Sequence, residues 1–168
     1  MLRSRKEFVE IYKKLESLSE TYNKKVLFVI FKNKQILKEL LDDIIKKESD
    51  ITTEDYAKME KERQNILLIH CERDSEGKPV IQNEQFSIKQ ESVTAFNDSV
   101  SKLFKDNEEV IKQYNENRKE FNTYINETIE LEFGKYSFND LPEDMSVEMY
   151  SLMSLFIKES EEELSKLV

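Results

Sequence analysis

Glycine and proline are nearly absent from this chain. Its 168 residues contain two of each, and these are the residues that most strongly interrupt helices. Gly77 and Pro79 lie together in one turn-like segment, while Gly134 and Pro142 bracket a second break near the C-terminal end. Long stretches are therefore free to be helical. The same scarcity argues against glycine-rich phosphate loops, nucleophile elbows and dinucleotide-binding fingerprints, which all need glycines at fixed positions.

The composition favours slender helical packing. Apolar residues make up 38% of the chain and charged residues 36%. Each helix is therefore expected to have a narrow apolar stripe and a broad solvent-exposed polar face. We predict a mainly α fold in a single domain over residues 1–168. It would be a helical bundle of four to five helices, with one or two small β-hairpins near 78–89 and 129–139 and an acidic C-terminal end over 158–168.

Sequence signals also predict where the protein resides. A single cysteine, Cys71, rules out an internal disulfide, and charged amphipathic sequence stands at the start instead of a signal peptide. The longest apolar run, residues 26–31, is far shorter than the roughly 20 residues of a membrane span. We expect a soluble, cytoplasmic protein with no membrane partner.

Apolar spacing predicts a long helix early in the chain. Ser4 and Glu7 form a capping box that starts a first, shorter helix. Residues 26–31 are β-branched and aromatic, which suits a strand, yet the helical period continues without a breaker. We therefore interpret 25–48 as one helix. Because its first two turns are apolar all round, we expect it to be the most buried element.

Helical spacing returns after each later break. A threonine at 52–53 caps a third helix, and helical stripes recur over 92–125 with a kink or short loop at 105–107. Strict alternation over 129–133 predicts a short strand, followed by a turn and a return strand. Ser146 caps the last helix.

The net charge of −9 is unevenly spread. Residues 1–47 carry twelve basic residues against seven acidic ones, and residues 127–163 carry eleven acidic residues against two lysines. A solvated acidic face is one interpretation. The other is electrostatic complementarity between the two ends, within one fold or between copies of the chain.

No cluster of residues indicates catalysis or metal binding. His70 and Cys71 are the only pair of soft ligands, whereas zinc takes three or four. Adjacent helix positions point about 100° apart, which also argues against a nucleophilic pair. Seven lysines make residues 24–47 basic. Acidic residues lie among them and lower the positive charge of this patch, so nucleic-acid binding is not favoured. We predict a non-enzymatic protein with no catalytic residues, no metal and no cofactor.

The closing helix is the best candidate for binding a partner. Met145, Met149 and Met153 recur every four residues as adaptable side chains along one edge, and further apolar residues follow a second edge. One edge should serve the core of the chain, and the other is either more core or a docking surface for a partner helix. The candidate partner-binding residues are Met149, Leu152, Met153, Phe156, Glu159, Glu161, Glu162 and Glu163.

Three stretches carry a family resemblance. They are Glu62-Arg63 leading into 74–81, residues 120–122 through 127–131, and Leu141-Pro142 continuing to 149–157. Together they resemble a family of small phage proteins of unknown function, encoded among the late, tail-proximal genes of phages infecting Gram-positive bacteria. Residues 89–118 depart from the family pattern as an added or enlarged helix.

The resemblance implies a phage context and transfers no catalytic residue. Partners would be other phage structural proteins or further copies of the chain, met in the host cytoplasm during synthesis or in the virion. We predict a minor virion component of the tail or neck, or an assembly factor, that acts through protein–protein contacts. The alternative is an acidic inhibitor of a host nucleic-acid enzyme or defence system, with carboxylates near 159–163 imitating a phosphate backbone.

Overall fold

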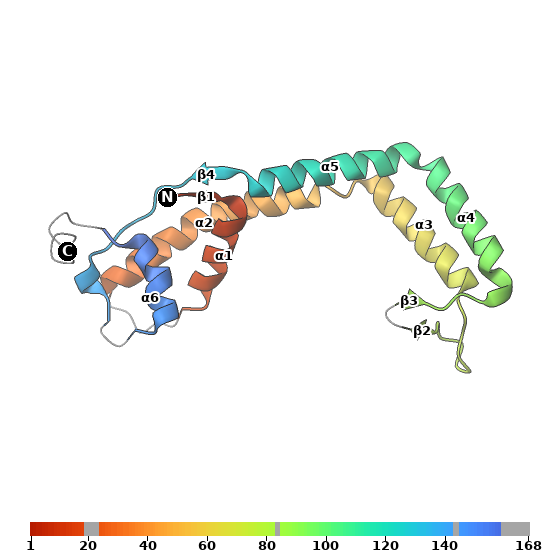
Figure 1. Ribbon diagram of the computed structural model, residues 1–168, viewed down its shortest axis with the longest axis horizontal. Helices are drawn as coiled ribbons and strands as arrows, with labels where there is room; N and C mark the ends of the chain where they lie inside the picture. The colour runs from red at the N-terminus through yellow and green to blue at the C-terminus, as the bar shows by residue number, and fades with distance from the viewer. Residues whose placement is uncertain (19–23, 83–84, 143–144, 159–168) are drawn as a thin grey trace. The chain divides into compact units, whose positions relative to one another are not determined.

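The computed structural model describes residues 1–18, 24–82, 85–142 and 145–158. Six α-helices and two antiparallel two-stranded sheets form within these residues (Figure 1), which confirms the mainly α fold class with small β elements. The chain divides into two compact units: unit 1 comprises residues 1–47 and 122–168, and unit 2 comprises residues 48–121. Folding of residues 1–168 as one domain stays a prediction.

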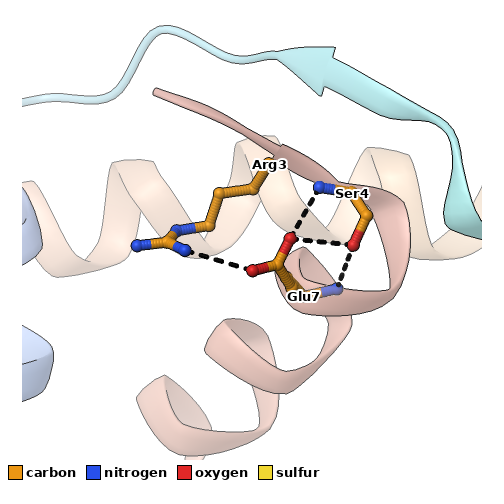
Figure 2. Close-up of polar contacts among 3 residues, drawn as sticks. All are labelled: Arg3, Ser4 and Glu7. Atoms are coloured by element: carbon orange, nitrogen blue, oxygen red, sulfur yellow. Dashed lines mark hydrogen bonds and ion pairs between the residues drawn. The ribbon is translucent and has the colours of Figure 1, made fainter.

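Helix α1 (Arg5–Glu16) of unit 1 begins with the predicted capping box. The Oγ of Ser4 accepts a hydrogen bond from the backbone N–H of Glu7, at 3.3 Å, and the carboxylate of Glu7 accepts one from the backbone N–H of Ser4, at 2.9 Å (Figure 2). Arg3 donates to the same carboxylate at 3.1 Å. These bonds lower the pKa of Glu7, with the backbone N–H of Ser4 as the largest cause.

Helix α2 (Lys24–Ser49) confirms the helical interpretation of residues 25–48, including the ambiguous apolar run. Although its first two turns are apolar all round, they are not buried on every side. Val26, Val29 and Ile30 are buried, whereas Phe28 and Phe31 are each 58% exposed. The apolar residues encircle the helix, but the rest of unit 1 covers it from one side, so two large aromatic side chains stay at the surface.

Strand β4 (Thr128–Glu130) confirms the predicted strand, but its partner differs from the expected one. It pairs antiparallel with strand β1 (Leu2–Ser4), with Ser4 opposite Thr128, and Figure 1 shows the two side by side. The hairpin expected near 129–139 is therefore replaced by a pairing with the start of the chain. Past β4, the chain is anchored on α2 through Gly134, and residues 138–140 form a 3₁₀ turn, η2 (Phe138–Asp140), in place of a return strand.

The core of unit 1 is formed by α1, α2 and the C-terminal segment, namely α6 (Val147–Met153) followed by the 3₁₀ turn η3 (Ser154–Phe156). Helix α6 contacts α1. Every core residue but one comes from these elements, the exception being Tyr136. The buried members of the cluster are Phe8, Ile11, Leu15, Val26, Val29, Ile30, Leu37, Tyr136, Leu152, Met153 and Phe156.

Among the residues of unit 1 that the structure describes, one polar side chain, that of Asn33, is fully buried. Asn33 donates from Nδ2 to the carbonyl oxygen of Gly134 at 3.0 Å, and its Oδ1 accepts from the N–H of Gly134 at 2.7 Å. A Cβ at position 134 would lie 3.3 Å from that Oδ1 and 3.5 Å from a methyl carbon of Val29. A larger residue at 134 would therefore crowd the side chains of Asn33 and Val29.

Replacing Asn33 should strongly destabilise unit 1. An Asn33→Ala variant leaves the N–H and carbonyl of Gly134 without their partner, and such unpaired groups should lower the free energy of unfolding by about 3 kcal/mol. Urea unfolding followed by circular dichroism measures the change. Asn97→Ala, at an exposed position of the chain, is the matched control and should change stability little. If both variants lowered the free energy of unfolding equally, the hydrogen bonds between Asn33 and Gly134 would have no special role in stability.

Unit 2 contains two packed helices and the predicted β-hairpin. Helix α3 (Glu54–His70), capped by Thr53 as predicted, packs against α4 (Val93–Asp106), which follows the 3₁₀ turn η1 (Gln90–Ser92). Strands β2 (Ile81–Gln82) and β3 (Gln85–Phe86) pair antiparallel. The kink expected at 105–107 is a break between α4 and α5 (Glu108–Asn126), because the side chain of Asn107 donates to the carbonyl of Leu103 and ends the helix.

The core of unit 2 is small. Its buried apolar side chains among the described residues are Met59, Cys71 and Leu103. The rings of Tyr56 and Tyr114 stack at 3.8 Å between centroids and nearly parallel, at 6°. Burial raises the pKa of Tyr56, and the nearby Glu60 adds to the shift.

Cys71 should report the opening of unit 2. Its thiol is fully buried, so we expect reaction with Ellman's reagent about 100-fold more slowly in the native protein than in urea. If residues 1–168 fold as one domain, thiol exposure and loss of helical circular dichroism will share one midpoint. A Cys71→Ser/Ser101→Cys variant, with its thiol at an exposed position of α4, is the fast-reacting control. Rapid labelling of the native wild type would contradict the burial.

Candidate protein-binding site

Helix α6 is fixed in place by the segment before it. Ser146 caps it, accepting from the N–H of Met149 at 3.2 Å. Buried Tyr136 donates its hydroxyl to the carbonyl of Met153 at 2.6 Å, and its N–H donates to the carbonyl of Phe156 at 3.1 Å. The phenol therefore satisfies a backbone oxygen at the end of α6, where helix carbonyls lack helical partners.

The predicted partner-binding residues fall into three groups. Leu152, Met153 and Phe156 are buried in the core of unit 1 and are not exposed to a partner. Met149 is half-buried and packs against that core. The acidic residues Glu159, Glu161, Glu162 and Glu163 lie outside the described residues. Both edges named from the sequence, the methionine edge and the second apolar edge, thus pack against the core of unit 1.

The opposite edge of α6 lines an apolar groove. Val147, which is 81% exposed, and Tyr150 come from α6, and the ring of Tyr150 meets that of Phe138 edge-on, with centroids 6.1 Å apart. The groove has a volume of about 490 Å³, within the size range of ligand pockets. Its lining residues are Phe138, Asn139, Leu141, Pro142, Met145, Val147 and Tyr150.

The turn that carries Phe138 is held by its own cap and by α2. Ser137 donates its N–H to the carboxylate of Asp140 at 2.9 Å, and Lys25 Nζ lies 2.6 Å from the same carboxylate. These contacts lower the pKa of Asp140, with the bond from Lys25 as the largest cause. The first turn of α2 is thereby tied to the groove.

Two further exposed aromatic residues, Phe28 and Phe31, lie on α2. Lys24, Phe28, Phe31 and Lys32 share one face of this helix, because they fall within about 100° of one another at 100° per residue. Lys32 Nζ lies 4.9 Å from the centroid of Phe28. We call the groove, with Phe138, Val147 and Tyr150 among its lining residues, the aromatic end of unit 1.

Sequence reasoning named Met145, which lines the groove, but missed Val147 and Tyr150. At 100° per residue Val147 lies on the side of α6 away from Leu152, Met153 and Phe156, and Tyr150 lies at the flank of that buried stripe. The pattern alone did not say which edge the core takes.

A polar junction joins the start of unit 1 to the end of α5. Arg5, with its side chain 15% exposed, donates to the carbonyl of Tyr124 at 3.0 Å and to Glu127 at 2.5 Å. Its guanidinium lies 4.0 Å from the centroid of the Tyr124 ring, and Lys47 Nζ lies 4.8 Å from it. The hydroxyl of Tyr124 donates to Asp43. These residues hold the start of α1, the end of α2 and the end of α5 together.

Charge complementarity between the two ends of the chain exists within the fold. Arg5 pairs with Glu127, and Lys25 pairs with Asp140. Each pair links the basic residues 1–47 to the acidic residues 127–163. The complementarity that the sequence analysis offered as one interpretation is thus present within unit 1 in these two pairs.

The described residues offer no metal centre. No three His, Cys, Asp or Glu side chains gather there as a metal site requires. The ring of His70 packs edge-on against Phe96, 6.0 Å between centroids, and the Cys71 sulfur lies 3.4 Å from the carbonyl oxygen of Leu68. None of the described helices has the length and apolar character needed to cross a bilayer.

Comparison with family models, curated proteins and solved structures found no match for this chain. The phage resemblance therefore stays a prediction.

Tyr124 should make stability fall at high pH. Burial raises its pKa above the ordinary 10.0, and the bond to Asp43 adds to the shift. The unfolded chain then releases this proton first, so the contribution is complete below about pH 10 and is lost as pH rises through the folded pKa. Chemical unfolding from pH 8 to 11.5 should show a steeper fall for wild type than for Tyr124→Phe. Parallel curves would contradict the shift.

Proposed function

We propose that this chain is a non-enzymatic protein that acts by binding another protein at the aromatic end of unit 1. The single observation that carries the proposal is the apolar groove, rimmed by exposed aromatic and aliphatic side chains. Apolar hollows with a few polar groups at the rim are the usual form of binding sites. A groove with aromatic residues suits the insertion of apolar anchors from a partner.

The setting we propose is a phage particle or its assembly, as a minor tail or neck component or an assembly factor. The resemblance of residues 74–81, 120–131 and 149–157 to late phage proteins supports this setting. The groove supports the mode of action, namely contact with a protein surface. The two parts of the proposal are separable, and each has its own measurement.

Capture from cells infected by the encoding phage tests the binding mode. Tagged wild type, a Val147→Asp/Tyr150→Ser variant and the control Ile45→Ser, exposed elsewhere on α2, are compared in low and high salt. We expect a late phage protein with wild type and control, retained in salt because the contact is apolar, and reduced about tenfold or more with the groove variant.

Two results would contradict the proposal. Equal capture by all three proteins would remove the groove from the interaction. A host nucleic-acid enzyme captured equally by all three, and lost in high salt, would instead favour the acidic inhibitor. The setting is tested separately by immunodetection in purified particles and in assembly intermediates, where absence from both would refute it.

A further inference from the structure

We propose that the C-terminal segment of this chain, residues 159–168, docks within the same molecule onto the exposed face of α2. We call this segment the acidic tail, and we call the face formed by Lys24, Phe28, Phe31 and Lys32 the basic face. The inference goes beyond the proposed function, because none of these residues lines the groove. It assigns a second surface of unit 1 and names its occupant.

The basic face has an apolar centre that no part of the described core covers. Phe28 and Phe31 are each 58% exposed, and at 100° per residue both point away from the buried stripe of α2. Lys32 Nζ lies 4.9 Å from the centroid of the Phe28 ring. Covering the two rings is favourable because apolar area leaves water, at about 25 cal/mol per Å². A suitable occupant therefore carries apolar side chains.

The charge of this part of α2 selects an anionic occupant. Residues 24–38 contain five lysines and no acidic residue. Two of these lysines form ion pairs with acidic residues elsewhere in unit 1. Lys24 and Lys32, both exposed, form no ion pair with a residue that the structure describes. Negative charge brought to the basic face would thus meet cations that the described part of the fold leaves uncompensated.

The acidic tail matches both properties of the face. Its first five residues include four glutamates, and its last five include Leu164, Leu167 and Val168. The glutamates are complementary to the lysines, and the apolar side chains suit contact with the phenyl rings. One short segment therefore supplies the negative charge and the apolar cover together.

The tail begins close enough to α2 to reach the basic face. Lys158, which precedes the tail, donates its N–H to the carbonyl of Tyr136 at 2.8 Å. Tyr136 follows two residues after Gly134, which is bonded to Asn33 of α2. Two residues span at most about 7 Å, and half the circumference of a helix adds roughly 17 Å. Ten extended residues span at most about 33 Å, so the chain length is sufficient.

Covalent attachment favours the tail over a separate anionic partner. A tethered segment acts at an effective concentration on the order of millimolar, so modest contacts suffice to hold it. The carboxylates of residues 159–163 are then engaged by the chain's own lysines. This role is the opposite of their role in the acidic inhibitor, where the same carboxylates face a host enzyme.

A tryptophan placed in the tail tests the proposal, because the chain contains none. Full-length Leu167→Trp is compared with the same protein carrying Phe28→Ser/Phe31→Ser, or carrying the control Ile45→Ser, exposed elsewhere on α2. We expect acrylamide to quench the indole about threefold less in Leu167→Trp and in the control than in the double-serine variant, because docking shields the ring. This protection should be constant from about 1 to 50 µM protein, as an intramolecular contact requires.

Charge variants in the Leu167→Trp background test the pairing. Lys24→Glu/Lys32→Glu should raise quenching to the value of the double-serine variant, since like charges then meet. Glu161→Lys/Glu162→Lys should do the same. Combining the four changes should restore protection, because both signs are inverted. Circular dichroism checks that every variant is folded.

Each other result overturns the inference. Equal quenching in Leu167→Trp and in the double-serine variant, or equal loss of protection with Ile45→Ser, would remove the basic face from the contact. Protection that increases with protein concentration would assign the tail to a second copy. Charge variants without effect, or without rescue in combination, would refute the pairing. Capture through Val147 and Tyr150 is measured separately, so the proposed function and this inference can each fail alone.

Discussion

The hydrogen bonds between Asn33 and Gly134 join positions 101 residues apart, and the arrangement of unit 1 depends on them. A buried asparagine is tolerated because both its amide donor and its carbonyl acceptor are paired with one backbone unit. The pairing fixes the course of the chain after β4. It thereby positions the residues that come after Gly134. Tyr136 enters the core two positions later and bonds the end of α6. The closing helix takes its place from this sequence of contacts.

The position of α6 then decides which residues are available to a partner. Its core edge is held by Tyr136 and by packing against α1, and its other edge must face outward with Val147 and Tyr150. Asp140 meets Lys25 for the same reason, because η2 is carried onto the first turn of α2. The aromatic end is thus a consequence of how the core closes. A binding groove needs a rigid support, and the buried hydrogen bonds between Asn33 and Gly134 supply one.

Charge has a different role here from the one that net charge alone indicates. The value of −9 predicts repulsion between copies, yet the basic and acidic ends partly neutralise each other inside unit 1 through Arg5 with Glu127 and Lys25 with Asp140. Arg5 and Lys47 also lie over the ring of Tyr124, where they form cation–π contacts.

Local chemistry was readable from the sequence alone. The capping box at Ser4 and Glu7, the caps at Thr53 and Ser146, the hairpin after Pro79 and the helical character of residues 25–48 depend on neighbours a few positions away, so spacing and residue type suffice to predict them. Tertiary structure decided the rest. The partner of β4, the burial of Asn33, the choice of core edge on α6 and the exposure of Phe28 and Phe31 all depend on contacts between residues far apart in the chain. A helical stripe states that a face is apolar, but only the packing of the other elements determines whether that face is covered.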